Sequence, residues 1–497
     1  MNQLYSYQTT AVDWMINREK SGNTTINDHD INVRGGILAD EVGLGKTLMS
    51  ISVVKQNPKK NTLILAPKSL LMQWKKEISL AAPDILVQLY DKTAENIENV
   101  DSDVVKIVLA SHSQLNAKNV DYSSSTLCGI YWDRIMIDEA HVIKNHKSKI
   151  HKACVSLSSS IKWALTATPV MNKMTDFINI LGWVGIPQGI CQAYKQLVSD
   201  TFILRRTKED VSEDNEKLKL PDCHIDIHRL PFTSDEEFNL YVSVYNKMKD
   251  ELEKLQKQGN KNTIRALELL LRVRQVCCHP QIYYDGIARK RRKNGQSGGR
   301  PYSGSCTKLN HIVNSVTKIP VGDKALIFCH FIREMDAYCD VLEENGIQCA
   351  RLDGSMDLIE RSDNVHSFNS DDDCKVFVIQ INTGGVGYNF QRANWLYITS
   401  PTWNPSLQHQ VIGRAHRTGQ SKEVHVNVYT IGDENNYYIE DHIMNLQRKK
   451  LKMIAEVLND PRLSPTDANE SDQAAPSLTF SDVSRMFKNV IHDKPTE

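Results

Sequence analysis

The amino-acid sequence predicts an α/β chain of two domains, each with a parallel β-sheet flanked by helices, together with helical insertions. A length of 497 residues is too great for one ordinary core, and about 150 residues per domain predicts two to four units. Apolar runs rich in β-branched residues occur in two series with helical segments between them, which is typical of buried parallel strands. A charged stretch separates the two series and therefore the two predicted sheets. The first series is Thr62–Ala66, Lys106–Ala110, Arg134–Ile137 and Lys162–Leu165, and the second is Lys324–Phe328, Lys375–Ile379, Trp395–Ile398 and Val424–Tyr429.

Four parts are expected along the chain. Residues 1–230 form a first lobe with a helical protrusion, 231–305 a helical linker, 306–460 a second lobe, and 461–497 a largely disordered polar tail. In the linker, Arg289–Ser305 is basic and rich in glycine and serine, which predicts a mobile loop. Its run Arg289–Lys293 is interpreted as a nuclear-import signal or a DNA-backbone anchor, with a merely solvated loop as the alternative. In the tail, Ser481–Ile491 is a candidate for a short terminal helix.

The composition excludes several classes of protein. The chain is 40% hydrophobic and 24% charged with a formal net charge of +0, so any DNA affinity must come from local basic strips. The first ten residues lack the apolar core of a secretory signal, and no apolar run approaches the ~18 residues of a membrane helix. The 11 cysteines include no Cys-x-x-Cys pair, which predicts reduced thiols in an intracellular compartment and no zinc module.

A glycine-containing segment between an apolar stretch and a helix-compatible stretch is a candidate phosphate-binding loop. Small residues allow backbone N–H groups to converge on phosphate oxygens. Lys46 is expected to reach the β- and γ-phosphates of ATP, and the Thr47 hydroxyl to hold Mg²⁺. The strict pattern lacks its first glycine, and an ordinary glycine turn is the alternative. The expected nucleotide contacts are Asp40, Glu41, Val42, Gly43, Leu44, Gly45, Lys46 and Thr47.

Two adjacent acids follow the apolar run Trp132–Ile137. Asp138 is expected to hold the Mg²⁺ shell, and Glu139 to orient and deprotonate the attacking water. Two acids at the end of a buried strand are costly without a cation to pair with. The alternative is a solvated turn, which the phosphate loop earlier in the same chain disfavours.

Further blocks make the chain resemble the Swi/Snf-type helicase-like ATPases of superfamily 2. In that family an aspartate normally occupies the place of the first glycine of the loop, as Asp40 does here. The resemblance implies two RecA-like lobes, ATP hydrolysis with Mg²⁺, and movement along double-stranded DNA. In size the chain resembles the baculovirus global transactivator proteins within this family. The blocks are Leu65–Trp74, Trp163–Pro169, Phe202–Lys208, Leu271–Pro280, Arg351–Ser355, Thr383–Asn389, Trp403–Pro405 and Gln410–Gln420.

The resemblance also implies roles for individual residues. Arg414 and Arg417 match the two arginines that the second lobe brings to the triphosphate, and Gln410 helps to sense the nucleotide. Such a finger contributes roughly 10³ to 10⁵ in rate in related enzymes. Gln8 is implied to read adenine, with a surface glutamine before an amphipathic helix as the alternative.

DNA contacts are implied mainly to phosphates, with little sequence preference. Thr166 and Thr168 are implied to link DNA contact to the ATP site. For Trp403, buried packing is an equal alternative to a role in the DNA groove. The implied contacts are Lys68, Ser69, Ser111, His112, Thr383, Asn389 and Trp403.

The chain also departs from the family at four positions, Ala167, Thr383, Ser400 and Gly413. None of these removes a phosphate, metal or arginine contact, but they can alter how hydrolysis is coupled to movement. The cluster of Cys277, Cys278 and His279 lacks the spacing of a tetrahedral zinc site.

The sequence therefore predicts an ATP-driven translocase on double-stranded DNA that remodels protein–DNA complexes and acts as a transcription activator. Transcription or chromatin proteins are the expected partners, the nucleus is the expected location, and neither a membrane nor zinc is expected. Two alternatives remain: a strand-separating helicase, and an activator that serves as a scaffold without needing hydrolysis.

Overall fold

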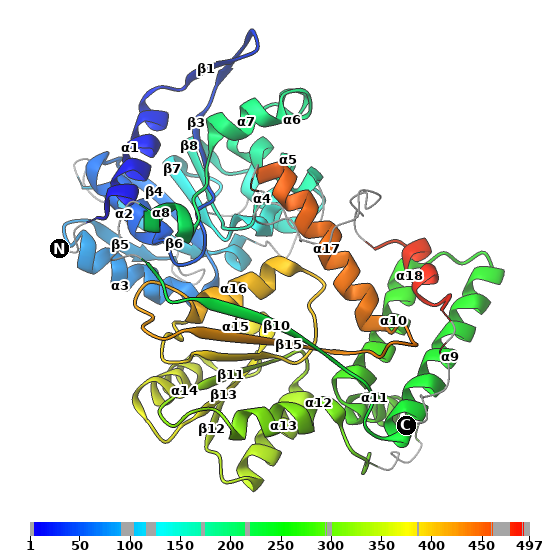
Figure 1. The fold of residues 1–497 in the computed structure, drawn as a ribbon. Helices are drawn as coiled ribbons and strands as arrows, with labels where there is room; N and C mark the ends of the chain where they lie inside the picture. The colour runs from blue at the N-terminus through cyan, green and yellow to red at the C-terminus, as the bar shows by residue number, and fades with distance from the viewer. Residues whose placement is uncertain are drawn as a thin grey trace. The chain divides into compact units, whose positions relative to one another are not determined.

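The computed structural model describes residues 4–90, 104–115, 126–169, 174–213, 219–293, 295, 301–384, 387–458, 460, 478–489 and 491. The chain divides into two compact units, which Figure 1 draws as a ribbon. Unit 1 contains Met1–Leu220 and Leu451–Thr466, and unit 2 contains Pro221–Lys450 and Asp467–Glu497. Within the described residues, no helix has the length and apolar character that crossing a membrane requires.

Unit 1 is built on a seven-stranded sheet in the order β5-β6-β4-β7-β8-β3-β9, in which all neighbours are parallel. Its strands are β3 (Arg34–Leu38), β4 (Asn61–Ala66), β5 (Leu86–Leu89), β6 (Lys106–Ser111), β7 (Tyr131–Asp138), β8 (Ser158–Leu165) and β9 (Ile203–Leu204). A separate antiparallel hairpin joins β1 (Asn23–Ile26) to β2 (His29–Asn32). Strands β4 and β6 are buried along nearly their whole length, which explains their continuous apolar sequence.

Helices lie between these strands along the chain. They are α1 (Ser6–Lys20), α2 (Lys46–Gln56), α3 (Leu71–Ala81), α4 (Lys149–Val155), α5 (Met174–Val184), α6 (Gln188–Ala193), α7 (Lys195–Phe202) and α8 (Lys208–Glu213), with short 3₁₀ turns η1 (Lys68–Leu70), η2 (His112–Leu115) and η4 (Ala140–Ile143). The last turns of α17 (Ile439–Leu458) also belong to this unit, where Met453, Ile454 and Val457 join its hydrophobic core.

Unit 2 contains a second parallel sheet of six strands, in the order β10-β15-β14-β11-β13-β12. Its strands are β10 (Cys223–Leu230), β11 (Ala325–Cys329), β12 (Cys349–Leu352), β13 (Val376–Gln380), β14 (Trp395–Ile398) and β15 (Val424–Ile431). The helices α12 (Thr307–Thr317), α13 (Ile332–Glu344), α14 (Leu358–Ser370), α15 (Ile381–Gly384) and α16 (Pro405–Ala415) accompany it. Separate apolar clusters pack around Phe328 and Ile327, whose side chains lie on opposite faces of β11.

These two sheets confirm the predicted fold class, but the boundary predicted at residue 230 is wrong. Strand β10 pairs along its full length with β15, so Cys223–Leu230 belongs to the second sheet and the boundary falls at Leu220. The sequence of β10 carries exposed polar residues between its apolar ones, as befits an edge strand. That pattern gives no indication of which sheet the strand joins.

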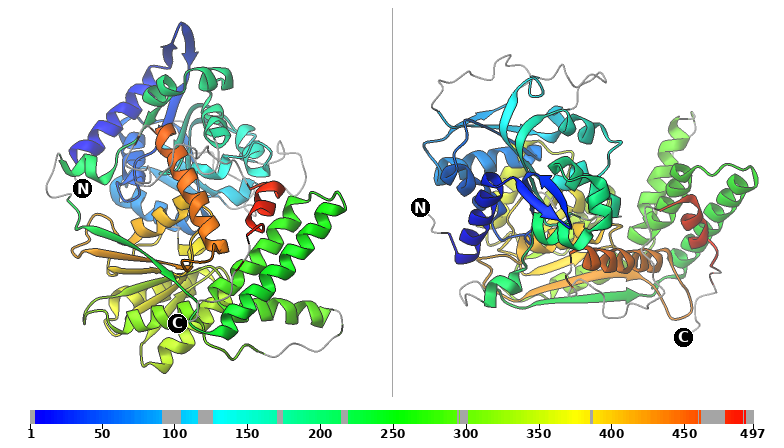
Figure 2. Two further views of the ribbon diagram at one scale, coloured as in Figure 1. Left: turned by 45° about the vertical axis from the view of Figure 1, so that its right-hand side comes forward. Right: turned by 90° about the horizontal axis from the view of Figure 1, so that it is seen from above.

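A helical region within unit 2 consists of α9 (Asp235–Lys257), α10 (Thr263–Cys278), α11 (Pro280–Lys293) and α18 (Phe480–Met486). The views in Figure 2 show α9 and α10 side by side, and α18 packs against α10. Aromatic residues of α9, including Tyr241 and Tyr245, form its core together with Phe480 and Phe487. A terminal helix is thus confirmed, but it ends at Met486 and not at the predicted Ile491. Residues 461–477 of the predicted disordered tail lie outside the described residues.

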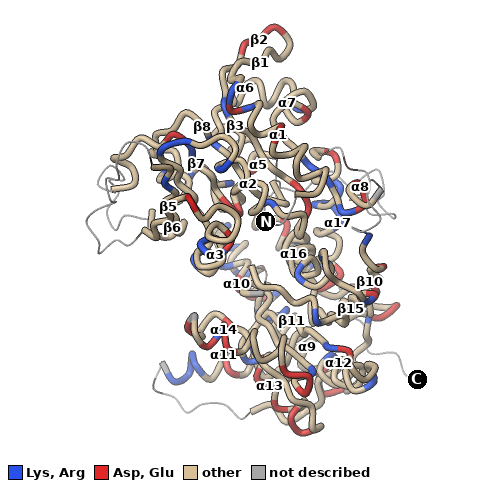
Figure 3. The backbone as a smooth tube through the Cα atoms, turned by 90° about the vertical axis from the view of Figure 1, so that its left-hand side faces the viewer, with Lys and Arg blue, Asp and Glu red and all other residues tan. Residues whose placement is uncertain are grey.

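The basic run Arg289–Lys293 is not part of a loop, contrary to the prediction. It forms the last turns of α11, whose basic end is blue in Figure 3. Arginine and lysine have high helix propensity, and Tyr283 anchors the same helix in the core of the helical region. The helix therefore continues through the basic run.

Candidate active site

The carboxyl ends of three neighbouring strands bring the predicted catalytic motifs to one edge of the first sheet. In the registers of β3, β8 and β7, Leu38 lies opposite Leu165, and Leu165 lies opposite Asp138. The backbone N–H of Thr166 continues this arrangement by donating to the Leu38 carbonyl at 3.1 Å. The phosphate loop after β3, the acids at the end of β7 and the threonines after β8 therefore start level with one another.

The phosphate loop turns through two glycines with positive φ, Gly43 at 98° and Gly45 at 82°. A methyl group at Gly45 would lie 2.6 Å from Nε2 of Gln8, so this position requires glycine for both its backbone and its space. Lys46 begins α2, and its Nζ donates to the carbonyl oxygens of Asp40 at 2.6 Å and Glu41 at 3.2 Å. Thr47 lies half-buried in the first turn of the same helix. The lysine thus lies over a concave loop followed by a helix N-terminus, an arrangement that binds anions.

The segment that contains Gln8 packs against this loop. Nε2 of Gln8 donates to the Leu44 carbonyl at 3.2 Å, and its Oε1 accepts from the backbone N–H of Tyr5 at 3.1 Å. The Tyr7 hydroxyl donates to the same Leu44 carbonyl at 3.1 Å. Gln8 is buried, so the alternative of a surface glutamine is wrong.

The aspartate that replaces the first glycine of the loop has a specific partner in Arg206. The fully buried Asp40 carboxylate accepts from the backbone N–H of Arg206 at 3.0 Å and from its Nε at 3.1 Å, and it pairs with Nη2. The same guanidinium donates to the Tyr7 carbonyl and lies 5.1 Å from the Tyr7 ring centroid. Next to this pair, Lys208 contacts Glu41 at 3.0 Å. One short segment thus holds both acids of the loop.

The Asp138 carboxylate is held in place by a tryptophan from α3. Nε1 of Trp74 donates to Oδ2 of Asp138 at 2.9 Å, and the backbone N–H of Glu139 donates to Oδ1 at 3.0 Å. Burial, together with the nearby charge of Glu139, raises the pKa of Asp138 to about 6. Glu139 adopts a left-handed backbone with φ of 50°, and its carboxylate lies 3.3 Å from Nδ1 of His141. Strained backbone of this kind is common where a side chain must be aimed.

Other predicted residues of unit 1 lie at the same edge of the sheet. Lys68 and Ser69 lie in η1 directly after β4, while Ser111 ends β6 and His112 begins η2. Burial lowers the pKa of His112 to about 4, although a hydrogen bond with the Asp138 backbone opposes this effect. The backbone N–H of Thr168 donates to the Thr166 hydroxyl at 3.2 Å. Within the described parts of the chain, the buried Thr168 hydroxyl has no hydrogen-bond partner.

In unit 2, the remaining predicted residues follow β13 and β14 at the carboxyl ends of those strands. Thr383 lies on α15, where its hydroxyl donates to Oε1 of Gln380 at 3.3 Å. Asn389 follows in the next loop and donates to Oε1 of Gln391 at 2.9 Å. Trp403 packs at the border of the helical region, with the Arg274 guanidinium 5.7 Å from its ring centroid.

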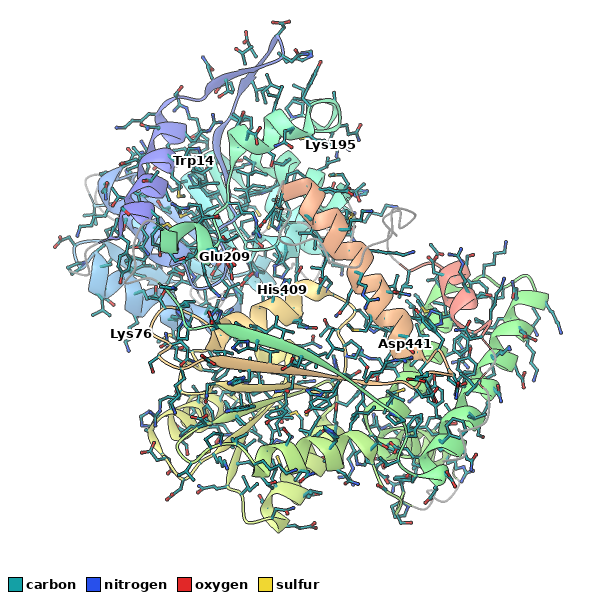
Figure 4. The ribbon with its side chains drawn as sticks, viewed as in Figure 1. Trp14, Lys76, Lys195, Glu209, His409 and Asp441 are labelled. Atoms are coloured by element: carbon teal, nitrogen blue, oxygen red, sulfur yellow. The ribbon has the colours of Figure 1, made fainter. Side chains whose placement is uncertain are left out.

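Helix α16 carries the predicted nucleotide-sensing residues of unit 2. Gln410 and Arg414 are buried, and Arg417 follows the helix. Figure 4 labels His409, the neighbour of Gln410 on this helix. Nε2 of Gln410 is buried without a hydrogen-bond partner among the described residues. Such an atom is costly unless a ligand or water satisfies it.

Among the residues that contact these motifs, Trp74 and Arg206 hold acidic side chains and had no predicted role. Both lie in blocks on which the family resemblance rests, Leu65–Trp74 and Phe202–Lys208. Their presence in those blocks was a signal, but their acidic partners are 64 and 166 residues away along the chain. Only the order of strands in the sheet brings each pair together.

The residues of unit 1 fit a magnesium–nucleotide complex. The positive φ of Gly45 and the close approach of Gln8 leave no space for a side chain at this position, and Lys46 supplies a positive charge next to it. Asp138 and Glu139 place two carboxylates side by side, and burial together with the charge of Glu139 raises the pKa of Asp138, although the charge of Lys46 opposes this effect. The oxygen atoms of Asp138 and Thr47 are of the kind that Mg²⁺ prefers as ligands.

A parallel sheet with a glycine–lysine loop after one strand and paired acids after a near neighbour defines a phosphate-loop nucleotide-binding protein. The chain belongs to the SNF2 family, because the SNF2-related domain matches residues 7–194 and 188–282. The helicase conserved C-terminal domain matches residues 307–419. These matches confirm the predicted family.

Three relatives illustrate the range of proteins that the chain resembles. It is 27% identical to the probable global transactivator of Orgyia pseudotsugata multicapsid polyhedrosis virus, over 93% of each chain. It is 27% identical to the ISWI chromatin-remodeling complex ATPase ISW1 of Saccharomyces cerevisiae, over 93% of this chain and 41% of the relative. It is 29% identical to the putative ATP-dependent helicase/translocase YwqA of Bacillus subtilis, over 85% of this chain and 46% of the relative. The chain thus spans less than half the length of the latter two.

A solved structure, the Sulfolobus solfataricus SWI2/SNF2 ATPase core in complex with dsDNA, matches 98% of both chains at 23% identity with a TM-score of 0.39. The fold is defined by the two parallel sheets and by the family matches.

Proposed function

We propose that the chain is an ATPase that is stimulated by duplex DNA and uses hydrolysis to move along it. The observation that carries this proposal is the alignment of the carboxyl ends of three adjacent strands in a member of the SNF2 family. These strands end at Leu38 before the phosphate loop that contains Lys46, at Asp138, and at Leu165 directly before Thr166. Ligands of open parallel sheets bind at this edge. The ATPase activity and its residues are therefore proposed together.

Each residue of the first unit has a proposed task. Lys46 neutralises charge on the β- and γ-phosphates, and Gln8 orients the base from its position against the loop. Thr47 and Asp138 would hold Mg²⁺, which supplies positive charge to the phosphate oxygens when bound. Glu139, whose backbone strain aims its carboxylate, orients the attacking water and accepts its proton.

Residues of the second unit complete the proposed reaction. Arg414 and Arg417 act as arginine fingers that stabilise charge on the transferred phosphoryl group, a contribution of roughly 10³ to 10⁵ in rate. Gln410 contributes to sensing the nucleotide, and its unsatisfied buried amide nitrogen supports this role. Since these residues lie in a different unit from Lys46, hydrolysis is expected to depend on DNA that engages both units.

Contacts with DNA are proposed to be mainly electrostatic and insensitive to sequence. In unit 1 the proposed contacts are Lys68, Ser69, Ser111 and His112, and in unit 2 they are Thr383, Asn389 and Trp403. Thr166 and Thr168 would link these contacts to the acids of the ATP site, and the unpartnered Thr168 hydroxyl supports that link.

The direct test is ATP turnover by the purified chain with and without duplex DNA. The wild type is expected to respond strongly to DNA, whereas Lys46→Ala and Glu139→Gln lose turnover at least about 100-fold. Lys55→Ala on the same helix is the matched control, since Lys55 donates to the Ala81 carbonyl at 3.0 Å and lies in the last turn of α2, away from the loop. Equal turnover with and without DNA would contradict the proposal.

We further propose that this activity serves transcription, with the nucleus as its location and transcription or chromatin proteins as partners. Similarity to a viral global transactivator along 93% of both chains supports that role. A reporter assay tests it: activation is expected to fall with Lys46→Ala. Activation that persists in this variant would favour a scaffold, and unwinding of a DNA fork would favour a strand-separating helicase.

A further inference from the structure

A pair of cysteines in unit 2 lies beside an ion pair that joins α13 to β12. Nη1 of Arg351 on β12 lies 2.9 Å from Oδ1 of Asp336 on α13, and these two elements pack against each other. Cys339 follows Asp336 by three residues, which places both on one face of the helix. Cys349 precedes Arg351 by two residues, which places both on one face of the strand. The ion pair between α13 and β12 therefore brings Cys339 and Cys349 close together.

Both thiols line one pocket of about 400 Å³, together with Asp336, Glu343 and Arg351. Each is partly exposed and packs at the edge of the same hydrophobic cluster. A hydrogen bond between the two thiols lowers the pKa of Cys339 and raises the pKa of Cys349. Arg351 adds to the effect on Cys339.

No other cysteines of the described chain share this arrangement. Seven of the eleven are buried, and the other two partly exposed ones are Cys128 and Cys223. Cys128 belongs to unit 1, and Cys223 begins β10 at the opposite edge of the second sheet from β12.

We propose that Cys339 and Cys349 form a modification site, a dithiol that a peroxide oxidises reversibly to a disulfide. The Cys339 thiolate attacks one peroxide oxygen, the O–O bond breaks, and the departing hydroxide takes up a proton to leave as water. The resulting sulfenic acid is attacked by the Cys349 sulfur, which forms the S–S bond and releases a second water. Two thiols are oxidised and one peroxide is reduced, so no other reactant is needed. The inference does not depend on the proposed ATPase activity.

The test treats the folded full-length chain with hydrogen peroxide, blocks the remaining thiols and maps its peptides by mass spectrometry. The wild type is expected to yield a linked Cys339–Cys349 peptide, lighter by two hydrogen atoms, which a dithiol reductant converts back. Cys349→Ser should stop at a sulfenic acid on Cys339 that dimedone captures. Cys339→Ser should yield no linked peptide, because Cys349 then has no second thiol in the pocket.

Cys223→Ser is the matched control and should form the linked peptide at the rate of the wild type. A second probe requires no oxidant: phenylarsine oxide, which bridges two adjacent thiols, should bind the wild type one-to-one and neither single serine variant. Circular dichroism before treatment establishes that each variant is folded, and the wild-type peptide map decides the question even where a serine variant is not. A map without the linked peptide, or with Cys223 oxidised as fast as Cys339, would overturn the proposal.

Discussion

The carboxylate of Asp40 accepts hydrogen bonds from both the backbone and the guanidinium of Arg206, across 166 residues of sequence. Asp40 is fully buried, and a buried charge is tolerated only when it is paired and hydrogen-bonded. The same arginine contacts the backbone and ring of Tyr7, whose hydroxyl bonds the phosphate loop. This geometry explains why an aspartate replaces the usual glycine: the Asp40 carboxylate ties the phosphate loop to Arg206.

We expect Arg206→Gln to weaken binding of a fluorescent ATP analogue by roughly tenfold, about 1.4 kcal/mol, because the loop loses its anchor. Asp40→Asn should have a similar effect. The double variant should cost less than the sum of the two, with a coupling of roughly 0.5–3 kcal/mol in a titration series. Arg265→Gln, which disrupts only exposed ion pairs, is the control. Additive effects would show that the two side chains act independently.

Trp74→Phe should raise the Mg²⁺ concentration needed for ATP turnover by roughly 10- to 100-fold. The change keeps most of the ring packing but removes the N–H that holds Asp138 Oδ2 at 2.9 Å. Trp395→Phe makes the same chemical change in unit 2, where the indole N–H bonds Asp323 at 2.9 Å. ATP turnover measured at increasing Mg²⁺ concentrations distinguishes Trp74→Phe from Trp395→Phe. An equal rise in the required Mg²⁺ concentration in both variants would refute a positioning role for Trp74.

Gly45→Ala should reduce ATP affinity by more than the strain of a positive φ alone would cause. The added methyl carbon would lie 2.6 Å from Nε2 of Gln8 and would displace that side chain. Gly346→Ala is matched to it, with φ of 70° and no neighbour within 4 Å of the added methyl group. Both should lose roughly 1 kcal/mol of stability from backbone strain. Titrations with ATP should show weaker binding in Gly45→Ala than in Gly346→Ala. Unchanged ATP affinity in Gly45→Ala would contradict the prediction.

His279 should make the chain less stable as the pH falls below about 6.5, the pKa of a histidine in an unfolded chain. Burial and the nearby Arg333 lower the pKa of His279 to about 4, and its Nδ1 accepts from the Gln281 N–H at 3.2 Å. Between these two pKa values only the unfolded state binds the proton, so the unfolding free energy falls by up to about 1.4 kcal/mol per pH unit. The contribution is complete above about pH 6.5 and is lost as the pH falls towards 4.

The measurement is urea unfolding of the full chain from about pH 7 to about pH 4.5. His279→Asn keeps an acceptor but cannot titrate, so its unfolding free energy should depend less on pH over this range. The exposed His366→Asn serves as the control. Parallel curves for the wild type and His279→Asn would contradict the prediction.

Much of this protein was predictable from local sequence. Six of the eight predicted strand runs lie within β4, β6, β7, β8, β14 and β15, and the other two begin one residue before β11 and β13, because buried parallel strands require continuous apolar residues. The phosphate loop and the acids were recognisable because their residues are adjacent in the chain. Their common location at one sheet edge follows from parallel strand direction alone.

Tertiary structure decided the features that depend on residues far apart. The sequence of β10 does not reveal that it pairs with β15, and the basic run after Tyr283 became helix because its helix was already anchored in a core. Strand order and helix packing also bring together the partners of three features that local sequence does not explain. These features are Arg206, Trp74 and the Cys339–Cys349 pair. Local sequence determines which conformation a segment favours, whereas the burial of apolar surface across the whole chain determines which segments meet.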